Sequence, residues 1–204
     1  MSAARARAAL AVADPKLGTL IERIGPRTIE GRRGERPEAH FEALARIVCG
    51  QQVSTAAART IWGRIVESFG GRPPAATDVV GATEQLRACG LSGRKVSYIE
   101  GLGEAVISGE IDLEELPEMD DEEVAEAIVS LRGFGQWSAE MFLMFQLARP
   151  DVFSGGDLGL RHGIRIVHEL DEIPSPAEAI ATAERWRPHR TTASLYLWEA
   201  IAPS

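Results

Sequence analysis

The sequence predicts an all-α protein. Apolar residues recur every three or four positions in segment after segment, which is the period of a helix with one buried face. No segment shows the two-residue alternation of a half-buried strand. Capping residues precede many of these segments and glycines follow them, which supplies start and stop signals. A chain of 204 residues is long enough for one or two compact domains.

The start and stop signals define the helices in order along the chain. Asp14-Pro15 supplies an N-cap and a first helical residue. Ser54 and Asp120 are predicted N-caps of later helices, and Gly70-Gly71 ends the helix that Ser54 begins. The predicted helices cover residues 1–13, 15–24, 41–49, 55–69, 79–89, 95–107, 121–131, 137–148, 158–170, 175–186 and 191–202.

The charge distribution permits nucleic-acid binding but does not predict it. The net charge is −8, and residues 110–126 hold ten of the 30 acidic side chains and no basic one. The 20 acidic residues elsewhere are slightly outnumbered by 22 basic residues. An acidic patch can face away from a ligand while a modestly basic face meets it.

Composition argues against several other classes of protein. No apolar run approaches the roughly 20 residues that span a bilayer, and the apolar stretch 8–13 is too short for a signal peptide. Cys49 and Cys89 are too few for a disulfide framework or a four-thiolate cluster, and the histidines lack zinc-site spacing. We therefore expect a cytoplasmic protein, nucleoid-associated if bacterial, with no metal held by side chains.

The turn from Leu131 to Ala139 is the first candidate for ligand binding. It joins two apolar helices, and Gly133 and Gly135 allow a tight turn that can approach another surface closely. Backbone amides at the start of the second helix can bind a phosphate without any lysine. An ordinary helix–helix turn with a glycine cap fits the same residues.

Asp157 is the second candidate, because it lies between a glycine-rich turn and a predicted helix. The run Gly155-Gly156-Asp157-Leu158 makes Asp157 a helix N-cap. A helix N-terminus favours negative charge. The capping role is compatible with a catalytic one.

These motifs together resemble a known family. The pattern L-x-G-[apolar]-G-x-x-[ST]-A is similar to the helix-hairpin-helix element of DNA repair and replication proteins. With Asp157 it resembles the helix-hairpin-helix DNA glycosylase superfamily, most closely the bacterial 3-methyladenine DNA glycosylase II (alkylpurine) group. The resemblance runs from Phe41 to Ala200 and includes residues 50–54, 151–157 and 184–188, followed by Trp198.

The resemblance implies a monofunctional glycosylase that hydrolyses the N-glycosidic bond of alkylated purines in base excision repair. It makes Asp157 the catalytic carboxylate, which would stabilise an oxocarbenium-like sugar. Relatives that also cut the strand carry a lysine where this chain has Trp137, so no Schiff base is expected. The resemblance implies a base pocket formed by Trp137, Trp198 and Met141. The two tryptophans suit a cationic alkylated purine, because tryptophan faces bind cations well.

The resemblance also implies how DNA is held. Gln52 takes the position of a wedge that fills the gap left by a flipped base, with Gln51 beside it. No cofactor is implied, although the hairpin carbonyls could hold a monovalent cation. The expected partner is double-stranded DNA containing alkylated bases, bound by a monomer. Phosphate is expected on the hairpin backbone at Gly133, Phe134, Gly135 and Ser138.

We expect a two-lobed protein without the additional N-terminal β domain that some relatives carry. Residues 38–150 would form a bundle ending in the hairpin, and residues 1–37 with 151–204 a second lobe, with the catalytic cleft between them. Three alternatives stay open: a non-enzymatic helix-hairpin-helix DNA-binding module, a glycosylase for another damaged or mismatched base, and a helical protein-interaction scaffold.

Overall fold

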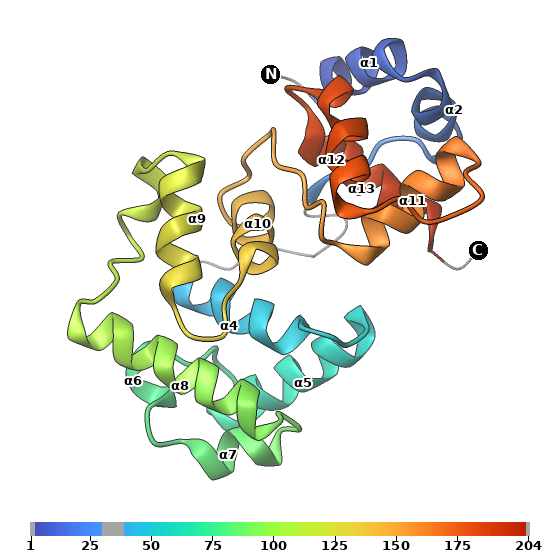
Figure 1. Cartoon of the computed structure of the whole chain (residues 1–204). Coiled ribbons are helices and arrows are strands. Elements are labelled where there is room, and N and C mark those ends of the chain that lie inside the picture. The colour runs from blue at the N-terminus through green and yellow to red at the C-terminus, as the bar shows by residue number, and fades with distance from the viewer. Residues whose placement is uncertain (1–2, 30–38, 203–204) are drawn as a thin grey trace. The chain divides into compact units, whose positions relative to one another are not determined.

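A computed structural model describes residues 3–29 and 39–202 of the protein (Figure 1). Within these residues every regular element is a helix and there is no strand, so the all-α prediction is confirmed. The chain divides into two compact units. Unit 1 consists of Met1–Glu35 and Leu143–Ser204, and unit 2 of Arg36–Phe142.

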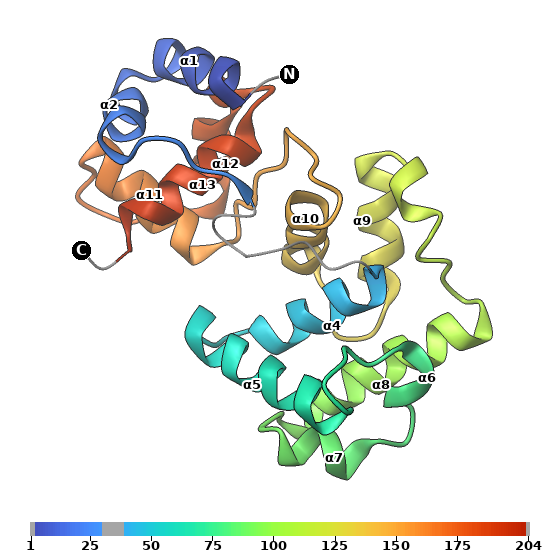
Figure 2. The same cartoon turned by 180° about the vertical axis from the view of Figure 1, so that it is seen from behind.

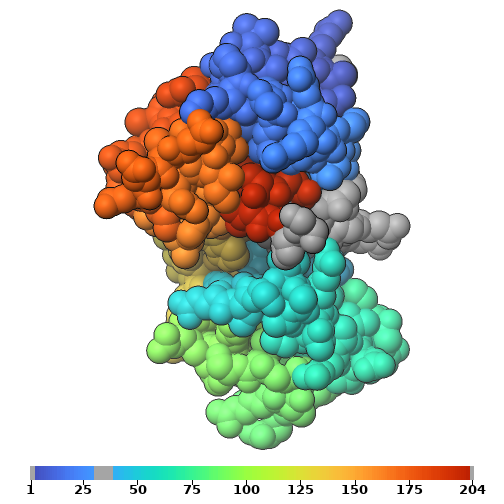
Figure 3. All heavy atoms as spheres, turned by 90° about the vertical axis from the view of Figure 1, so that its right-hand side faces the viewer, coloured from blue at the N-terminus to red at the C-terminus, as the bar shows by residue number. Residues whose placement is uncertain are grey.

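Unit 1 packs the first two helices of the chain against helices from its last third. Its helix α2 packs against α1, α11 and α13, and α11 packs against α13. In Figure 3 the blue atoms of the first helices accordingly lie beside orange and red atoms from the end of the chain. Its elements are α1 (Ala3–Ala13), α2 (Pro15–Ile24), α11 (Leu158–His168), α12 (Pro176–Ala183), the 3₁₀ helix η2 (Glu184–Trp186) and α13 (Arg190–Ala200).

Glycines on α11 allow α13 to approach closely. Gly159 and Gly163 are one turn apart and therefore lie on the same face of the helix. A Cβ atom on Gly163 would overlap the Leu197 carbonyl and lie 2.8 Å from Leu197 Cβ, so only glycine fits this contact. The close packing brings Trp198 of α13 near the start of α11.

Unit 2 is built around α8, which packs against α4, α6 and α7, as the two opposite views of Figures 1 and 2 show. Leu44, Ile99, Leu102 and Ile128 are fully buried in its core. Its elements are α4 (His40–Gly50), α5 (Thr55–Ser68), α6 (Ala76–Val79), α7 (Thr83–Ala88), α8 (Gly93–Ser108), the 3₁₀ helix η1 (Leu116–Glu118), α9 (Asp121–Ser130) and most of α10 (Gln136–Phe145).

Three predicted helices differ from the structure, one of them only because the helix predicted at 175–186 ends as the 3₁₀ helix η2. The single helix predicted at residues 79–89 is wrong, because the chain forms α6 and α7 with a break between them. Gly81 adopts a φ of 78° in this break, and the Ala82 N–H donates to the Val79 carbonyl at 3.1 Å. Helix α10 ends three residues earlier than predicted, where Ala148 adopts a φ of 53° just beyond it.

Candidate active site

Asp157 is the N-cap residue of α11. Its Oδ1 accepts the N–H of Leu160 at 2.8 Å, which confirms the capping role predicted from the sequence. The preceding turn is closely packed, because a Cβ atom on Gly155 would lie 2.5 Å from Ile180 Cγ1 and 3.1 Å from the Pro176 carbonyl oxygen. The Asp157 side chain is partly exposed. The fold therefore holds a carboxylate at a helix N-terminus and leaves it accessible.

Trp198 contacts the same carboxylate oxygen from α13. Its indole Nε1 donates to Asp157 Oδ1 at 3.0 Å. A Cβ atom on Gly159 would lie 3.0 Å from Asp157 Oδ1 and 3.2 Å from Trp198 Nε1, so the bare glycine makes room for this contact. The indole ring lies against Phe145, with ring centroids 5.7 Å apart, and Trp198 is only 6% exposed. In this structure Trp198 orients the carboxylate, and the base contact predicted for it stays a prediction.

The hairpin follows α9 and turns tightly into α10. Gly133 adopts a φ of 92°, and a Cβ atom there would overlap the ring of Tyr98, so its glycine is required twice over. The Phe134 N–H donates to the Leu131 carbonyl at 3.1 Å, and the Ser138 N–H donates to the Gly135 carbonyl at 2.8 Å. These two amides have acceptors within the chain. Among the residues predicted to bind phosphate, exposed Gly135 offers the most open backbone.

The loop between α4 and α5 carries the predicted wedge. Gln52 is exposed and adopts a φ of 55°. Gln51 behaves differently, because its Nε2 donates to the Gly133 carbonyl at 3.0 Å and to Ser138 Oγ at 3.3 Å. The structure thus brings Gln51 to the hairpin and presents Gln52 to solvent.

Comparison with known proteins identifies the family. The HhH-GPD superfamily of base excision DNA repair proteins matches residues 45–188. The chain belongs to this superfamily. DNA-3-methyladenine glycosylase 1 of Schizosaccharomyces pombe is 37% identical over 162 residues, which cover 78% of this chain and 71% of that protein. A putative DNA-3-methyladenine glycosylase of Bacillus subtilis is 31% identical over 168 residues, covering 79% of this chain but only 58% of that relative.

The superfamily fold extends over nearly the whole chain. The structure of the Schizosaccharomyces pombe 3-methyladenine DNA glycosylase Mag1 in complex with abasic DNA has a TM-score of 0.89 and 34% identity. The match covers 96% of this chain and 95% of that one. The family and fold predicted from the sequence are therefore confirmed.

The remaining predicted base-pocket residues of this HhH-GPD protein differ in accessibility. Trp137 lies in the first turn of α10 and is partly exposed. Met141, one turn further on, is 1% exposed, and its place in the base pocket stays a prediction. Trp137 and Met141 belong to unit 2, whereas Asp157 and Trp198 belong to unit 1. The predicted cleft stays a prediction.

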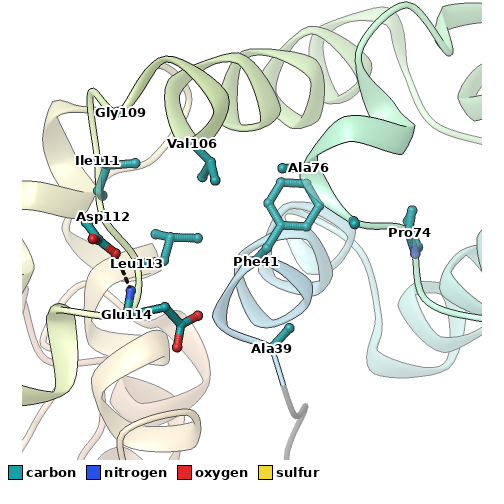
Figure 4. Close-up of a pocket in the computed structure, with 11 residues that line it drawn as sticks. Ala39, Phe41, Pro74, Ala76, Val106, Gly109, Ile111, Asp112, Leu113 and Glu114 are labelled. Atoms are coloured by element: carbon teal, nitrogen blue, oxygen red, sulfur yellow. Dashed lines mark hydrogen bonds between the residues drawn. The ribbon is translucent and has the colours of Figure 1, made fainter.

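A hollow of about 380 Å³ in unit 2 contains none of the predicted site residues (Figure 4). Apolar side chains that include Phe41 and Val106 line it together with Asp112 and Glu114, and Asp112 Oδ1 accepts the Glu114 N–H at 2.9 Å. These carboxylates belong to the acidic run 110–126. Because negative charge repels phosphate, we do not assign DNA binding to this hollow.

Two features are absent from residues 3–29 and 39–202. No group of three or more His, Cys, Asp or Glu side chains is arranged to hold a metal ion. None of the helices there has both the length and the apolar character needed to cross a membrane.

Sequence reasoning missed one residue of the site, Gly159, and one contact, that of the predicted wedge residue Gln51 with the hairpin. Gly159 makes room for the Asp157–Trp198 contact, and its signal was the Gly159-x-x-x-Gly163 spacing within one helix. The link from Gln51 to the hairpin left no local signal, because its partners lie 82 and 87 residues away.

Proposed function

We propose that this protein is a monofunctional DNA glycosylase that removes alkylated purines of the 3-methyladenine type from double-stranded DNA. The observation that carries the proposal is the partly exposed Asp157 carboxylate, held by the Leu160 amide and the Trp198 indole. The names of the relatives, DNA-3-methyladenine glycosylases, support alkylated purines as the substrate.

Asp157 would act on the bond between base and sugar. Cleavage of this bond develops positive charge on the deoxyribose. A carboxylate about 4 Å away stabilises that charge by on the order of 4 kcal/mol at an effective dielectric constant near 20, which is about three decades of rate. Because two donors hold Oδ1 before DNA arrives, the negative charge needs little reorganisation during the reaction. The same carboxylate can orient the attacking water.

The lysines support hydrolysis without strand cleavage. Glycosylases that cleave the strand form a Schiff base between an amine and the sugar. Lysine occurs in this sequence only at positions 16 and 95. Lys16 Nζ pairs with Glu169 Oε2 at 2.8 Å, and Lys95 Nζ donates to the Cys49 carbonyl at 2.9 Å. Burial lowers the pKa of Lys95, which would favour a neutral amine. Because both lysine amines nevertheless bind acceptors within the protein, we infer that water is the nucleophile.

Trp137 is the proposed platform for the flipped base. Its partly exposed indole can stack on a purine, which is worth roughly 1–3 kcal/mol. A purine alkylated at a ring nitrogen is cationic, and an indole face attracts a cation. Positive charge also activates the base as a leaving group, so one carboxylate suffices without a separate general acid.

The test of this function uses duplex DNA treated with dimethyl sulfate and a matched duplex containing 8-oxoguanine. We expect release of 3-methyladenine and 7-methylguanine and no release of 8-oxoguanine. The strand should stay intact until alkali is added, and borohydride should trap no protein–DNA adduct. An adduct would contradict the monofunctional mechanism, and release of 8-oxoguanine alone would favour a glycosylase for oxidised bases. DNA binding without base release would favour a non-enzymatic module.

A further inference from the structure

We propose that Gln51 is a positioning residue that fastens the loop carrying Gln52 to the hairpin. In this arrangement the wedge loop and the phosphate-binding turn form one rigid structural unit. The inference rests on the proposed function for the roles of Gln52 and the hairpin. It assigns Gln51 a task other than entering the DNA.

The Gln51 amide bridges the two sides of the hairpin. Its Nε2 carries two N–H groups, and it contacts one acceptor on the turn, the Gly133 carbonyl, and one on α10, the Ser138 hydroxyl. Ser138 is 2% exposed, so this hydroxyl is directed into the protein and not toward a phosphate. A side chain that satisfies two buried or half-buried acceptors is costly to remove.

The loop itself is held at both ends. The Gln51 N–H donates to the Val48 carbonyl at 3.2 Å at the end of α4, and Ser54 Oγ accepts the Ala57 N–H at 3.2 Å at the start of α5. Between these points Gln52 has a φ of 55°, a conformation that costs a non-glycine residue energy and persists only where its surroundings impose it. The Gln51 side chain is the contact that ties this strained segment to the hairpin.

Helix α8 contacts both the hairpin and the end of α4. Tyr98 packs directly against Gly133 of the hairpin, and Lys95 Nζ donates to the Cys49 carbonyl near the end of α4. Gln51 adds the direct link between the end of α4 and the hairpin, so that each of these three segments contacts the other two. A wedge must break base stacking and pairing, and breaking them costs free energy. A wedge on a rigid loop can displace the base, whereas a flexible loop would move away instead.

This role predicts a dependence on base pairing. Without the Gln51 link, extrusion of a paired purine should suffer, because it needs the wedge. Excision of the same purine with no partner base should suffer little, because no pair has to be broken. A purely structural role would lower both rates equally.

The experiment compares Gln51→Glu with a matched control, Gln85→Glu. Glutamate has the shape of glutamine but no N–H donor to offer Gly133 and Ser138. Gln85 Nε2 makes the same pair of contacts elsewhere in unit 2, donating to the Ser68 carbonyl at 2.7 Å and to Ser68 Oγ at 3.3 Å. One readout is the fluorescence of 2-aminopurine beside a tetrahydrofuran abasic analogue, at saturating protein. The other is 7-methylguanine release opposite cytosine and opposite tetrahydrofuran.

We expect Gln51→Glu to weaken the fluorescence change and to slow release opposite cytosine about tenfold, as the loss of two hydrogen bonds implies. Release opposite tetrahydrofuran should be unchanged, and Gln85→Glu should match the wild type throughout. Equal slowing on both substrates, wild-type fluorescence, or the same defect in Gln85→Glu would overturn the proposal. If the wild type releases no base, the proposed function fails, yet the fluorescence still decides the role of Gln51.

Discussion

Asp14 and Asp157 are two helix N-caps with nearly the same hydrogen bonds. Each accepts the backbone N–H three residues further on, at 3.1 Å for Asp14 and 2.8 Å for Asp157. Each also accepts an indole N–H from a distant tryptophan, Trp186 at 2.9 Å and Trp198 at 3.0 Å. Both belong to unit 1.

Burial separates the two aspartates. Asp14 is 2% exposed, Trp186 is fully buried, and the His168 ring lies against both, with Nε2 3.2 Å from Asp14 Oδ2. The two donors to Asp14 use different oxygens, whereas the two donors to Asp157 meet at Oδ1. The same arrangement is buried in the core at Asp14, whereas at Asp157 it leaves the carboxylate partly accessible to solvent.

The largest expected effect on stability comes from Asp14→Ala. This change removes a helix cap and leaves the buried Trp186 N–H without an acceptor, so we expect a loss of about 2–4 kcal/mol in the free energy of unfolding. Urea unfolding measures it. Base release well below the melting temperature should persist, and a folded but inactive variant would contradict a purely structural role for Asp14.

Trp198→Phe should separate orientation from stacking. Phenylalanine keeps an aromatic ring but loses the N–H that holds Asp157 Oδ1, so single-turnover base release should fall about tenfold. The Kd for abasic DNA should stay constant. The matched change Trp186→Phe should lower the free energy of unfolding and leave the rate intact. A weakened Kd with an unchanged rate for Trp198→Phe would instead indicate contact with the DNA.

Gly159→Ala is a smaller perturbation of the same contact. The added Cβ atom would lie 3.1 Å from Trp198 Cδ1 as well as close to Asp157, so the ring or the carboxylate must shift by a few tenths of an ångström. We expect a modest reduction in the single-turnover rate, smaller than that of Trp198→Phe. Equal activity in Gly159→Ala and wild type would show that the carboxylate tolerates displacement.

The smallest expected effect is the acid sensitivity that His168 confers on the Asp14 cluster. Burial lowers the pKa of His168 below its usual 6.5, while Asp14 opposes this shift and Arg185 and Lys16 add to it. The folded protein therefore resists protonation of His168, and the free energy of unfolding should decrease as pH falls below about 6.5. His168→Gln should flatten this decrease in urea unfolding at different pH values. An unchanged slope would place the acid sensitivity elsewhere.

Local features were predictable from the sequence because their partners lie nearby. A cap depends on the backbone three residues on, so Asp14, Ser54, Asp120 and Asp157 were all predicted correctly. The prediction of one helix at residues 79–89 was wrong for a local reason too, because Gly81 favours a left-handed turn over a helix interior.

Contacts between distant segments were not predictable. Trp198 lies 41 residues from Asp157, and Gln51 lies 82 residues from Gly133. The sequence indicated residue types suited to DNA repair, but not which tryptophan face or amide is accessible. Burial of Met141 and Trp198 depends on the packing of several helices, which no single segment encodes.

The most direct test of the proposed catalytic role of the Asp157 carboxylate is the single-turnover rate of 7-methylguanine release by Asp157→Asn. Asparagine retains the helix cap but removes the charge, so we expect a loss of about a thousandfold with unchanged binding to abasic DNA. Asp14→Asn, measured below its melting temperature, should retain the wild-type rate. A wild-type rate for Asp157→Asn would show that this carboxylate does not act on the sugar.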